Sequence, residues 1–321
     1  MRAVELTGTM ADSRVEVREV DAPQDEAERI VVDVASAGIT RMEPRWATSW
    51  RYADGTPRRP PVKLGLEFAG RVRSLGLGVR GFAPGQDVLG MIEPSRGGAL
   101  AEAVSAPAHQ VCGMPPGLSY EDASVLPLAG LTAWQGIVRH GELAPGQRVL
   151  IQGGAGGVGA FATQIARWIG AHVTVTAAAR DLRLCRELGA DEVIDFERER
   201  FEDRGARYDL VFDQIGGEVQ DRSWGVLKRG GRLITIAGEQ DDAPDQMRAR
   251  ALGVTAKFFV VESDLGELRR LVDLVIAGSV RSVIGERFDL SSVPEAFGDR
   301  CGHFPGKAVL IRPEASFAAA K

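Results

Sequence analysis

The segment over residues 149–162 constrains the fold of this chain more than any other part of its sequence. It reads VLIQGGAGGVGAFA, so an apolar run leads into a cluster of glycines and small residues follow. Gly154, Gly156 and Gly159 have the G-x-G-x-x-G spacing, in which glycines permit a tight turn and the helix N-terminus binds a pyrophosphate. A flexible turn is the alternative, but the flanking predicted strand and helix favour a nucleotide-binding loop. Its expected contacts are Gly154, Ala155, Gly156, Gly157, Val158 and Gly159.

Short runs of β-branched, apolar residues recur in the second part of the chain. They lie at 149–151, 172–176, 192–194, 209–212 and 232–236. Such runs suit strands that are buried on both faces of a parallel sheet. Helical segments are predicted between them, at 158–169, 181–188 and 218–227. This alternation predicts an α/β domain with a doubly wound parallel sheet.

The first third of the chain has a different pattern. Polar and apolar residues alternate over 15–20 and 29–35, and 67–75 is a further predicted strand. Glycines punctuate the region that follows, as expected for short strands joined by tight turns. Residues 51–61 are predicted to form a loop, because their prolines and glycine do not fit a helix or a central strand.

The C-terminal part adds a predicted helix at 265–277, a shorter one at 293–297 and a last strand at 307–311. A chain of 321 residues exceeds what one hydrophobic core usually serves, so two domains are expected. The late strand suggests that the C-terminus returns to the first domain.

Charge and cysteine content exclude several classes of protein. The net charge is −5, with Lys+Arg 39 against Asp+Glu 44 and no long basic run, so nucleic acid is not an expected partner. No apolar stretch is long enough to cross a bilayer, and the N-terminus turns polar too early for a signal peptide, so no membrane association is expected. Three cysteines, an odd number, argue against a disulfide framework and for a reducing, cytoplasmic compartment.

The end of the second strand of the α/β domain distinguishes two nicotinamide cofactors. NAD-selective sites have an acidic residue there to bond the ribose hydroxyls, whereas NADP-selective sites have a cation for the 2′-phosphate. The strand ends near Thr176, and Arg180 is the first charged residue after it. Arginine suits phosphate through its planar fork of donors, so NADPH is expected. The alternative is that Arg180 only solvates the following helix, with Asp181 as its N-cap.

Six segments in a fixed order carry a resemblance to a known family. They are GLEFAGRV (65–72), similar to G-H-E-F-x-G-x-V, PLAGLTAW (127–134), the glycine loop (153–159), LGADEVID (188–195), FDQIGG (212–217) and GKAVL (306–310). Together they resemble the medium-chain dehydrogenase/reductase superfamily along nearly the whole chain. The resemblance implies a GroES-like β-rich catalytic domain over 1–122, completed by 262–321, and a Rossmann NADP-binding domain over 123–261. It also implies a cleft between the domains and a homodimer.

The metal ligands of the zinc alcohol dehydrogenases in this superfamily are missing. Leu66 stands at the position of the family histidine, residues 37–40 contain no cysteine, and the lobe with four cysteines is absent. Zinc prefers clustered thiolate and imidazole ligands, and the histidines form no such cluster. They are His109, His140, His172 and His303. We therefore expect no metal, and the resemblance is to the zinc-independent, quinone oxidoreductase-like branch.

The resemblance implies cofactor contacts outside the glycine loop. Thr132 matches a threonine that approaches the nicotinamide, residues 237–238 fall where the family's chain passes close to it, and 258–260 align with a strand whose backbone can pair with the carboxamide. The expected contacts are Thr132, Thr176, Arg180, Ala237, Gly238, Phe258, Phe259 and Val260. Simple core packing is the alternative, above all for the two phenylalanines.

The expected substrate is a small, apolar, conjugated carbonyl compound, either a quinone or an enone. The residues of the implied cleft are rich in aromatic side chains, which favour flat apolar ligands; they are Trp46, Trp50, Tyr52, Phe258 and Phe259. A quinone needs no strong general acid, whereas an enone can use a hydroxyl donor. Tyr52 is one candidate and Thr40, at a position where quinone reductases commonly have Asn, is another. Alternatively, Tyr52 only anchors its loop beside Trp46 and Trp50.

Charged residues in the same segment leave two other functions open. Arg41, Glu43, Arg45 and Arg51 could mark a carboxylated or thioester-linked substrate. The alternative enzyme is a pathway-specific enoyl reductase or reductive cyclase acting on a polyketide-like intermediate. The alternative without catalysis is a sensor that binds NADPH.

Overall fold

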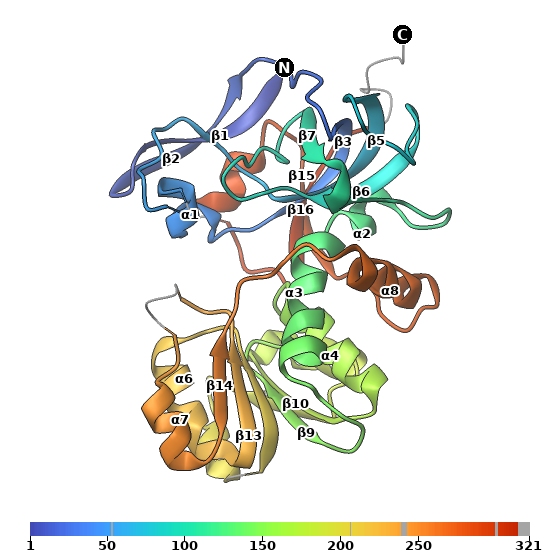
Figure 1. The fold of residues 1–321 in the computed structure, drawn as a ribbon. Coiled ribbons are helices and arrows are strands. Elements are labelled where there is room, and N and C mark those ends of the chain that lie inside the picture. Colours follow the sequence, from blue (N-terminus) through green and yellow to red (C-terminus); the bar gives the residue numbers. More distant parts are fainter. Residues whose placement is uncertain (53, 206, 239–242, 299–300, 314–321) are drawn as a thin grey trace. The chain divides into compact units, whose positions relative to one another are not determined.

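The computed structural model describes residues 1–52, 54–205, 207–238, 243–298 and 301–313, and Figure 1 shows its fold. The chain divides into two units. The first contains residues 1–128, 263–272 and 284–321, and the second contains 129–262 and 273–283. This division differs from the expected domain boundaries at three places, one of which is the single residue 262, which packs with the second unit. Residues 123–128 pack with the first unit, and residues 273–283 pack with the second.

Strand β3 (Arg29–Ile39) is the centre of the first unit, and all of its residues are buried. It pairs antiparallel with β5 (Glu67–Leu75), β7 (Ala103–Pro107) and β16 (Lys307–Ile311). Three further strands extend this sheet: β6 (Asp87–Met91), β8 (Val111–Gly113) and β15 (Ile284–Phe288). A smaller sheet has the order β2-β1-β4, from β2 (Asp12–Glu19), β1 (Arg2–Thr9) and β4 (Val62–Lys63).

The C-terminal strand returns to the first unit, as the sequence predicts. In its register with β3, Ala308 faces Ile39 and Val309 faces Gly38. Lys307 is therefore brought next to Thr40, the residue that follows β3. The helices of this unit are α1 (Ala47–Trp50), α2 (Tyr120–Ala123) and the first part of α8 (Leu265–Ile276).

The second unit is built on a six-stranded sheet with the order β11-β10-β9-β12-β13-β14, and all of its pairings are parallel. Its strands are β9 (Arg148–Ile151), β10 (His172–Ala177), β11 (Glu192–Asp195), β12 (Tyr208–Asp213), β13 (Leu227–Thr235) and β14 (Thr255–Phe258). The chain moves outward from β9 to β11 and then returns to place β12 beside β9. The carboxyl ends of β9 and β12 are thus the switch point at which doubly wound sheets bind ligands.

Helices cover both faces of this sheet (Figure 1). They are α3 (Leu131–Trp134), α4 (Gly159–Ile169), α5 (Leu182–Glu187), α6 (Gly217–Ser223) and α7 (Gln246–Leu252). Right-handed crossovers that run in opposite directions from the switch point place α4 and α5 on one face and α6 and α7 on the other. The GroES-like and Rossmann classes expected from the sequence are confirmed in the two units.

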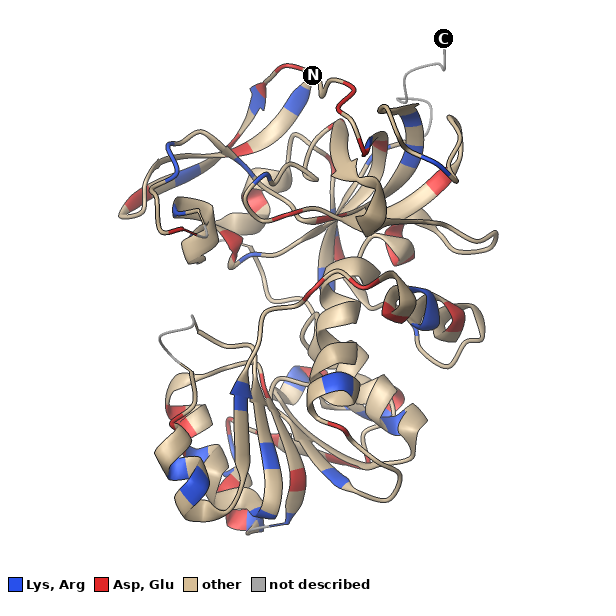
Figure 2. Cartoon of the chain, in the orientation of Figure 1, with Lys and Arg blue, Asp and Glu red and all other residues tan. Residues whose placement is uncertain are grey.

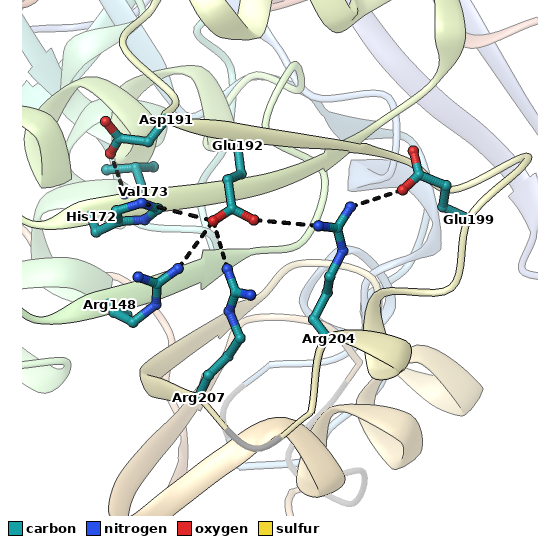
Figure 3. Close-up of polar contacts among 8 residues, drawn as sticks. All are labelled: Arg148, His172, Val173, Asp191, Glu192, Glu199, Arg204 and Arg207. Carbon is teal, nitrogen blue, oxygen red and sulfur yellow. Dashed lines mark hydrogen bonds and ion pairs between the residues drawn. The ribbon is translucent and has the colours of Figure 1, made fainter.

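One carboxylate ties together the amino ends of neighbouring strands in this sheet (Figure 3). Glu192, the first residue of β11, lies 3.1 Å from Arg148 at the start of β9 and 2.6 Å from Arg207 just before β12. Arg204 at 3.7 Å and His172, the first residue of β10, at 3.8 Å complete the group. The glycine loop follows the opposite, carboxyl end of β9.

Charged residues of both signs are scattered over both units (Figure 2). Among the residues that the structure describes, no helix is both long enough and apolar enough to cross a membrane.

Candidate cofactor and acceptor sites

The glycine loop joins β9 to α4 at the switch point. A Cβ at Gly154 would lie 2.5 Å from Val175 Cβ, and one at Gly159 would lie 2.1 Å from Gly153 O. Both glycines are therefore required for the close packing of strand, turn and helix. A Cβ at Gly156 would make only an ordinary contact, 3.4 Å from Gly153 O, and Gly156 is exposed. The missing side chain at Gly156 thus leaves room for a ligand to approach from outside.

The N-terminus of α4 is suited to an anion. Val158 occupies the N-cap position, and no side chain caps the first turn. The Ala160 N–H bonds Gly156 O (2.9 Å), so the other N–H groups of the first turn and the positive end of the helix dipole are what this end of α4 would offer to a pyrophosphate.

Thr176, at the end of β10, fixes the start of this loop. Its hydroxyl accepts a hydrogen bond from the Gly153 N–H (3.0 Å) and donates one to Gln152 Oε1 (2.9 Å). Its carbonyl accepts a third bond from the Gly154 N–H (2.9 Å). Because Thr176 is only 4% exposed, its side chain positions the loop from behind.

Arg180 lies in a 3₁₀ turn (Ala179–Asp181) after the end of β10, and its side chain is 59% exposed. Its ion pair with Asp181 is long, 3.9 Å from Nε to Oδ2, so the guanidinium keeps donors for an incoming phosphate. Asp181 stands at the N-cap of α5 but makes no side-chain capping hydrogen bond. The alternative interpretation, with Asp181 at the N-cap of this helix, is therefore correct for the position of Asp181, and only the side-chain capping hydrogen bond is missing.

Asp213 is a structural residue of the site that motif reasoning missed. It is fully buried at the end of β12, and its Oδ1 accepts hydrogen bonds from the N–H groups of Ile215 (2.9 Å) and Gly216 (3.1 Å). Its Oδ2 accepts from Gln220 Nε2 and from the Thr235 hydroxyl, both at 3.2 Å. An acid directly after a buried strand and before two glycines was the available signal, since aspartate side chains commonly close such turns.

The segment after β13 packs against this turn. The Ala237 N–H donates to Thr235 Oγ1 (3.1 Å), and a Cβ at Gly216 would lie 2.9 Å from Ala237 Cβ. Gly238 has φ +87°, which favours glycine. Ala237 and Gly238 therefore lie at the carboxyl edge of the sheet, as do the glycine loop and the Asp213 turn.

The predicted strand over 258–260 is correct only for its first residue. Strand β14 ends at Phe258, because its register places Phe258 opposite Thr235, the last residue of β13. Phe259 is 6% exposed, its ring lies 4.6 Å from that of His140, and its N–H already bonds Thr235 O (3.2 Å). Val260 is 66% exposed. Phe259 thus packs in the core, as the alternative reading of this segment held.

Thr132 is 7% exposed and lies in α3. Helix α3 belongs to the second unit, so Thr132 shares a unit with all the other expected cofactor contacts.

The candidate acceptor residues Thr40 and Tyr52 belong to the first unit. Thr40 is half-buried, and its hydroxyl accepts a hydrogen bond from Lys307 Nζ (2.8 Å). Tyr52 is 46% exposed, its N–H bonds Thr56 O (2.8 Å), and its ring lies 5.7 Å from the Arg58 guanidinium. Trp50 was expected to line the acceptor site, but it is only 7% exposed. Its indole N–H donates to Pro44 O (2.8 Å), and its ring packs in the core.

Two sequence families match this chain. Residues 26–116 match the alcohol dehydrogenase GroES-like domain, and residues 188–310 match the zinc-binding dehydrogenase family. The mitochondrial NAD(P)H oxidoreductase RTN4IP1 of Danio rerio is 33% identical over 323 residues, which cover 88% of this chain and 83% of that protein. The chain belongs to the medium-chain dehydrogenase/reductase superfamily.

Two further relatives lie in the same superfamily. The chloroplastic NADPH-dependent alkenal/one oxidoreductase of Arabidopsis thaliana is 30% identical over 299 residues, 90% of this chain and 73% of that protein. The solved structure of a quinone oxidoreductase from Coxiella burnetii superposes with a TM-score of 0.87 at 27% identity, covering 98% of this chain and 99% of that one. The resemblance to the quinone oxidoreductase-like branch is confirmed.

At the superfamily's metal-ligand positions this chain has apolar and hydroxyl side chains. Leu66 is 4% exposed and packs in the core of the first unit. Within the described ranges, no three or more His, Cys, Asp or Glu residues gather as a group that could hold a metal ion.

A buried acidic residue, Glu43, lies three positions after Thr40 in the first unit, and its N–H bonds Thr40 O (2.9 Å). Glu43 is 4% exposed, and both of its carboxylate oxygens accept the Gly65 N–H, at 2.9 and 3.1 Å. Burial raises the pKa of Glu43 from 4.5 to about 7, and the nearby negative charge of Glu67 adds to this rise. The hydrogen bond from Gly65 and the positive charges of Lys307 and Arg58 lower the pKa, but by less than burial raises it.

The raised pKa of Glu43 predicts a pH-dependent stability. Between pH 4.5 and about pH 7 the folded state holds a proton at Glu43 that the unfolded state has lost. Protonation of Glu43 therefore contributes to the stability of the fold in full below pH 4.5, and this contribution is lost by about pH 7. Glu43→Gln, which keeps an acceptor for Gly65, should gain stability relative to wild type as the pH rises, by on the order of 3 kcal/mol across this window. Thermal unfolding of both proteins between pH 4.5 and 8 measures the difference.

The matched control is Glu16→Gln on the exposed face of β2, which makes the same substitution outside the buried site. A Glu43→Gln offset from wild type that does not change with pH would show that Glu43 is ionised in the folded protein throughout the range.

Proposed function

We propose that this protein is a zinc-independent reductase that transfers hydride from NADPH to a conjugated carbonyl acceptor, a quinone or an enone. Membership of the superfamily and its relatives make it an oxidoreductase that uses NADP(H). The observation that carries the proposal is the glycine loop at the switch point, with Arg180 in place of an acid after β10. The residues at the metal positions, Leu66 and Thr40, support a reaction without zinc.

The residues of the second unit fit the cofactor. The open face at Gly156 and the uncapped N-terminus of α4 would hold the pyrophosphate, and Arg180 would hold the 2′-phosphate. The turns held by Thr176 and Asp213 would keep these groups in place without rearrangement. Bound NADPH supplies the hydride, so the task left to this chain is orientation of the two reactants and exclusion of water.

The acceptor class rests on relatives and on the chemistry of the first unit. An alkenal/one oxidoreductase and a quinone oxidoreductase are among the similar proteins. In the first unit Thr40 offers a hydroxyl, and Trp46 and Tyr52 keep exposed aromatic surface. These groups suit a flat acceptor whose oxygen becomes negatively charged during reduction.

The acceptor is tested by following NADPH oxidation with a small quinone, a simple enone and an enoyl thioester in parallel, each with and without a metal chelator. We expect turnover of the quinone or the enone that survives chelation. Preference for the enoyl thioester would favour the pathway-specific reductase instead. Turnover that disappears on chelation, or oxidation of simple alcohols alone, would reject the proposal, and NADPH binding without any turnover would indicate a sensor.

Arg180→Ala tests the cofactor assignment. Loss of one charge-assisted contact to the 2′-phosphate should weaken NADPH binding by about 1.5–3 kcal/mol and leave NADH binding nearly unchanged. Titration of both cofactors against tryptophan fluorescence gives the two dissociation constants. Arg183→Ala, which removes an exposed arginine paired with Glu187 on α5, is the matched control and should change neither. Equal weakening of NADPH and NADH in Arg180→Ala would contradict the assignment.

We further propose that the protein forms a homodimer. The superfamily resemblance implies it, and β14 is an edge strand whose outer side has no partner strand among the described residues. Light scattering after size-exclusion chromatography should give twice the chain mass of 34.4 kDa. A mass of one chain at micromolar concentration would reject this proposal.

A further inference from the structure

A buried ammonium group stands behind the Thr40 hydroxyl in the first unit. Lys307 Nζ lies 2.8 Å from Thr40 Oγ1 and 2.9 Å from Glu67 Oε1. The Lys307 side chain is 9% exposed and the Glu67 side chain is fully buried. Lys307 is therefore held in one place by its packing and by its carboxylate partner.

The direction of the bond to Thr40 follows from the chemistry of the two groups. An ammonium has three N–H donors and no lone pair, so Lys307 must donate and Thr40 Oγ1 must accept. The single hydroxyl proton of Thr40 is then left to donate elsewhere, and no second side-chain partner for it occurs in the described part of the chain. Because Thr40 is half-buried, this donor is accessible from outside the core.

The surroundings of Glu67 show that the arrangement is built into the sheet. A Cβ at Gly38 would lie only 2.2 Å from Glu67 Oε1, so a glycine is needed there to admit the carboxylate. The other oxygen, Oε2, accepts the Leu128 N–H (2.8 Å). A nearby cation would be enough to neutralise Glu67. Lys307 in addition lies within hydrogen-bond distance of Thr40, so its position serves both groups.

We propose that Lys307 is a positioning residue that orients Thr40 as a hydrogen-bond donor to the acceptor oxygen. This inference rests on the proposed reduction of a conjugated carbonyl. In this reaction a C–H bond of NADPH, which is oxidised to NADP⁺, would break, and a C–H bond would form on the acceptor, which is reduced. An electron pair moves onto the acceptor oxygen, and water then supplies the proton. A hydroxyl that accepts from Lys307 keeps its own proton for donation, and with a positive charge beside it that donor stabilises the charge that develops on the acceptor oxygen. Thr40 is the catalytic group, and Lys307 acts only through it.

The role of Thr40 as a hydrogen-bond donor predicts that its loss lowers kcat more for an enone than for a quinone. The oxyanion of a reduced quinone is stabilised by its own ring, whereas the enolate formed from a simple enone depends more on the protein. Thr40→Val should lower kcat for 2-cyclohexenone on the order of 100-fold, the usual effect of removing one oxyanion donor. For a small benzoquinone the loss should stay below about tenfold, and KM for NADPH should not change.

The role of Lys307 is tested in a double-mutant cycle. Lys307→Met alone would leave Glu67 buried without its cation, so the paired variant Lys307→Met/Glu67→Gln replaces both charges and keeps the fold. It should lower kcat for the enone as far as Thr40→Val does, and it should cause no further loss when Thr40 is already valine. Thr40→Ser, which keeps the hydroxyl, should restore most of the activity. The control Lys228→Met removes a lysine–carboxylate pair with Asp209 and should leave kcat unchanged.

The outcomes separate this inference from the proposed function. If wild type reduces the enone but Thr40→Val is as active, or if the losses from Thr40→Val and from the paired variant multiply, the orienting role of Lys307 is wrong while the reductase assignment stands. If wild type with NADPH reduces neither acceptor, the proposed function fails and this role fails with it.

Discussion

The first unit depends on the neutralisation of one buried carboxylate by the far end of the chain. Glu67 is fully buried, and a charge in such a place is tolerated only beside a compensating charge and with its oxygens hydrogen-bonded. Lys307 provides the cation, and it reaches Thr40 across 267 positions of sequence. Removing one partner of a buried pair typically costs about 3–5 kcal/mol. Strand β16 is therefore an integral part of the first unit, and its register with β3 decides what stands beside Thr40.

The second unit holds its ligand edge in place by hydrogen bonds between buried side chains and the backbone. Side chains of Thr176 and Asp213 bond directly to backbone N–H groups of the neighbouring turns. These bonds fix the turns before any ligand arrives, so binding has little loop entropy to overcome. Gly156 and Arg180 are exposed and do not anchor the turns through a side chain, so they can interact with a ligand.

Much of this architecture is predictable from sequence, because local patterns specify it. The strand over 67–75 and the last strand over 307–311 occur at their predicted bounds, and α8 begins at the predicted residue. Strand β15 escaped prediction because it contains a glycine and is only half-buried, so it lacks a periodic apolar face. Phe259 has strong strand propensity, but no partner strand extends that far.

The contacts of the candidate site were less accessible to sequence reasoning. The ion pair of Lys307 with Glu67 depends on the register between strands from opposite ends of the chain, which no local pattern reports. The glycine loop, by contrast, was found from the spacing of its glycines together with the strand and the helix predicted on either side of it, which are all local features of the sequence. The Asp213 turn lies between these cases, because the motif was visible but its hydrogen bonds were not.

The carboxylate of Glu192 stabilises the amino ends of the strands in the second unit, whereas ligands are expected at their carboxyl ends. It binds arginines at the amino ends of strands whose carboxyl ends carry the nucleotide loop and the Asp213 turn. Substitution of an exposed residue at the ligand edge, such as Arg180, leaves these ion pairs untouched. Such a scaffold can acquire a new cofactor preference by mutation at one edge of the sheet while ion pairs hold the strands together at the other edge.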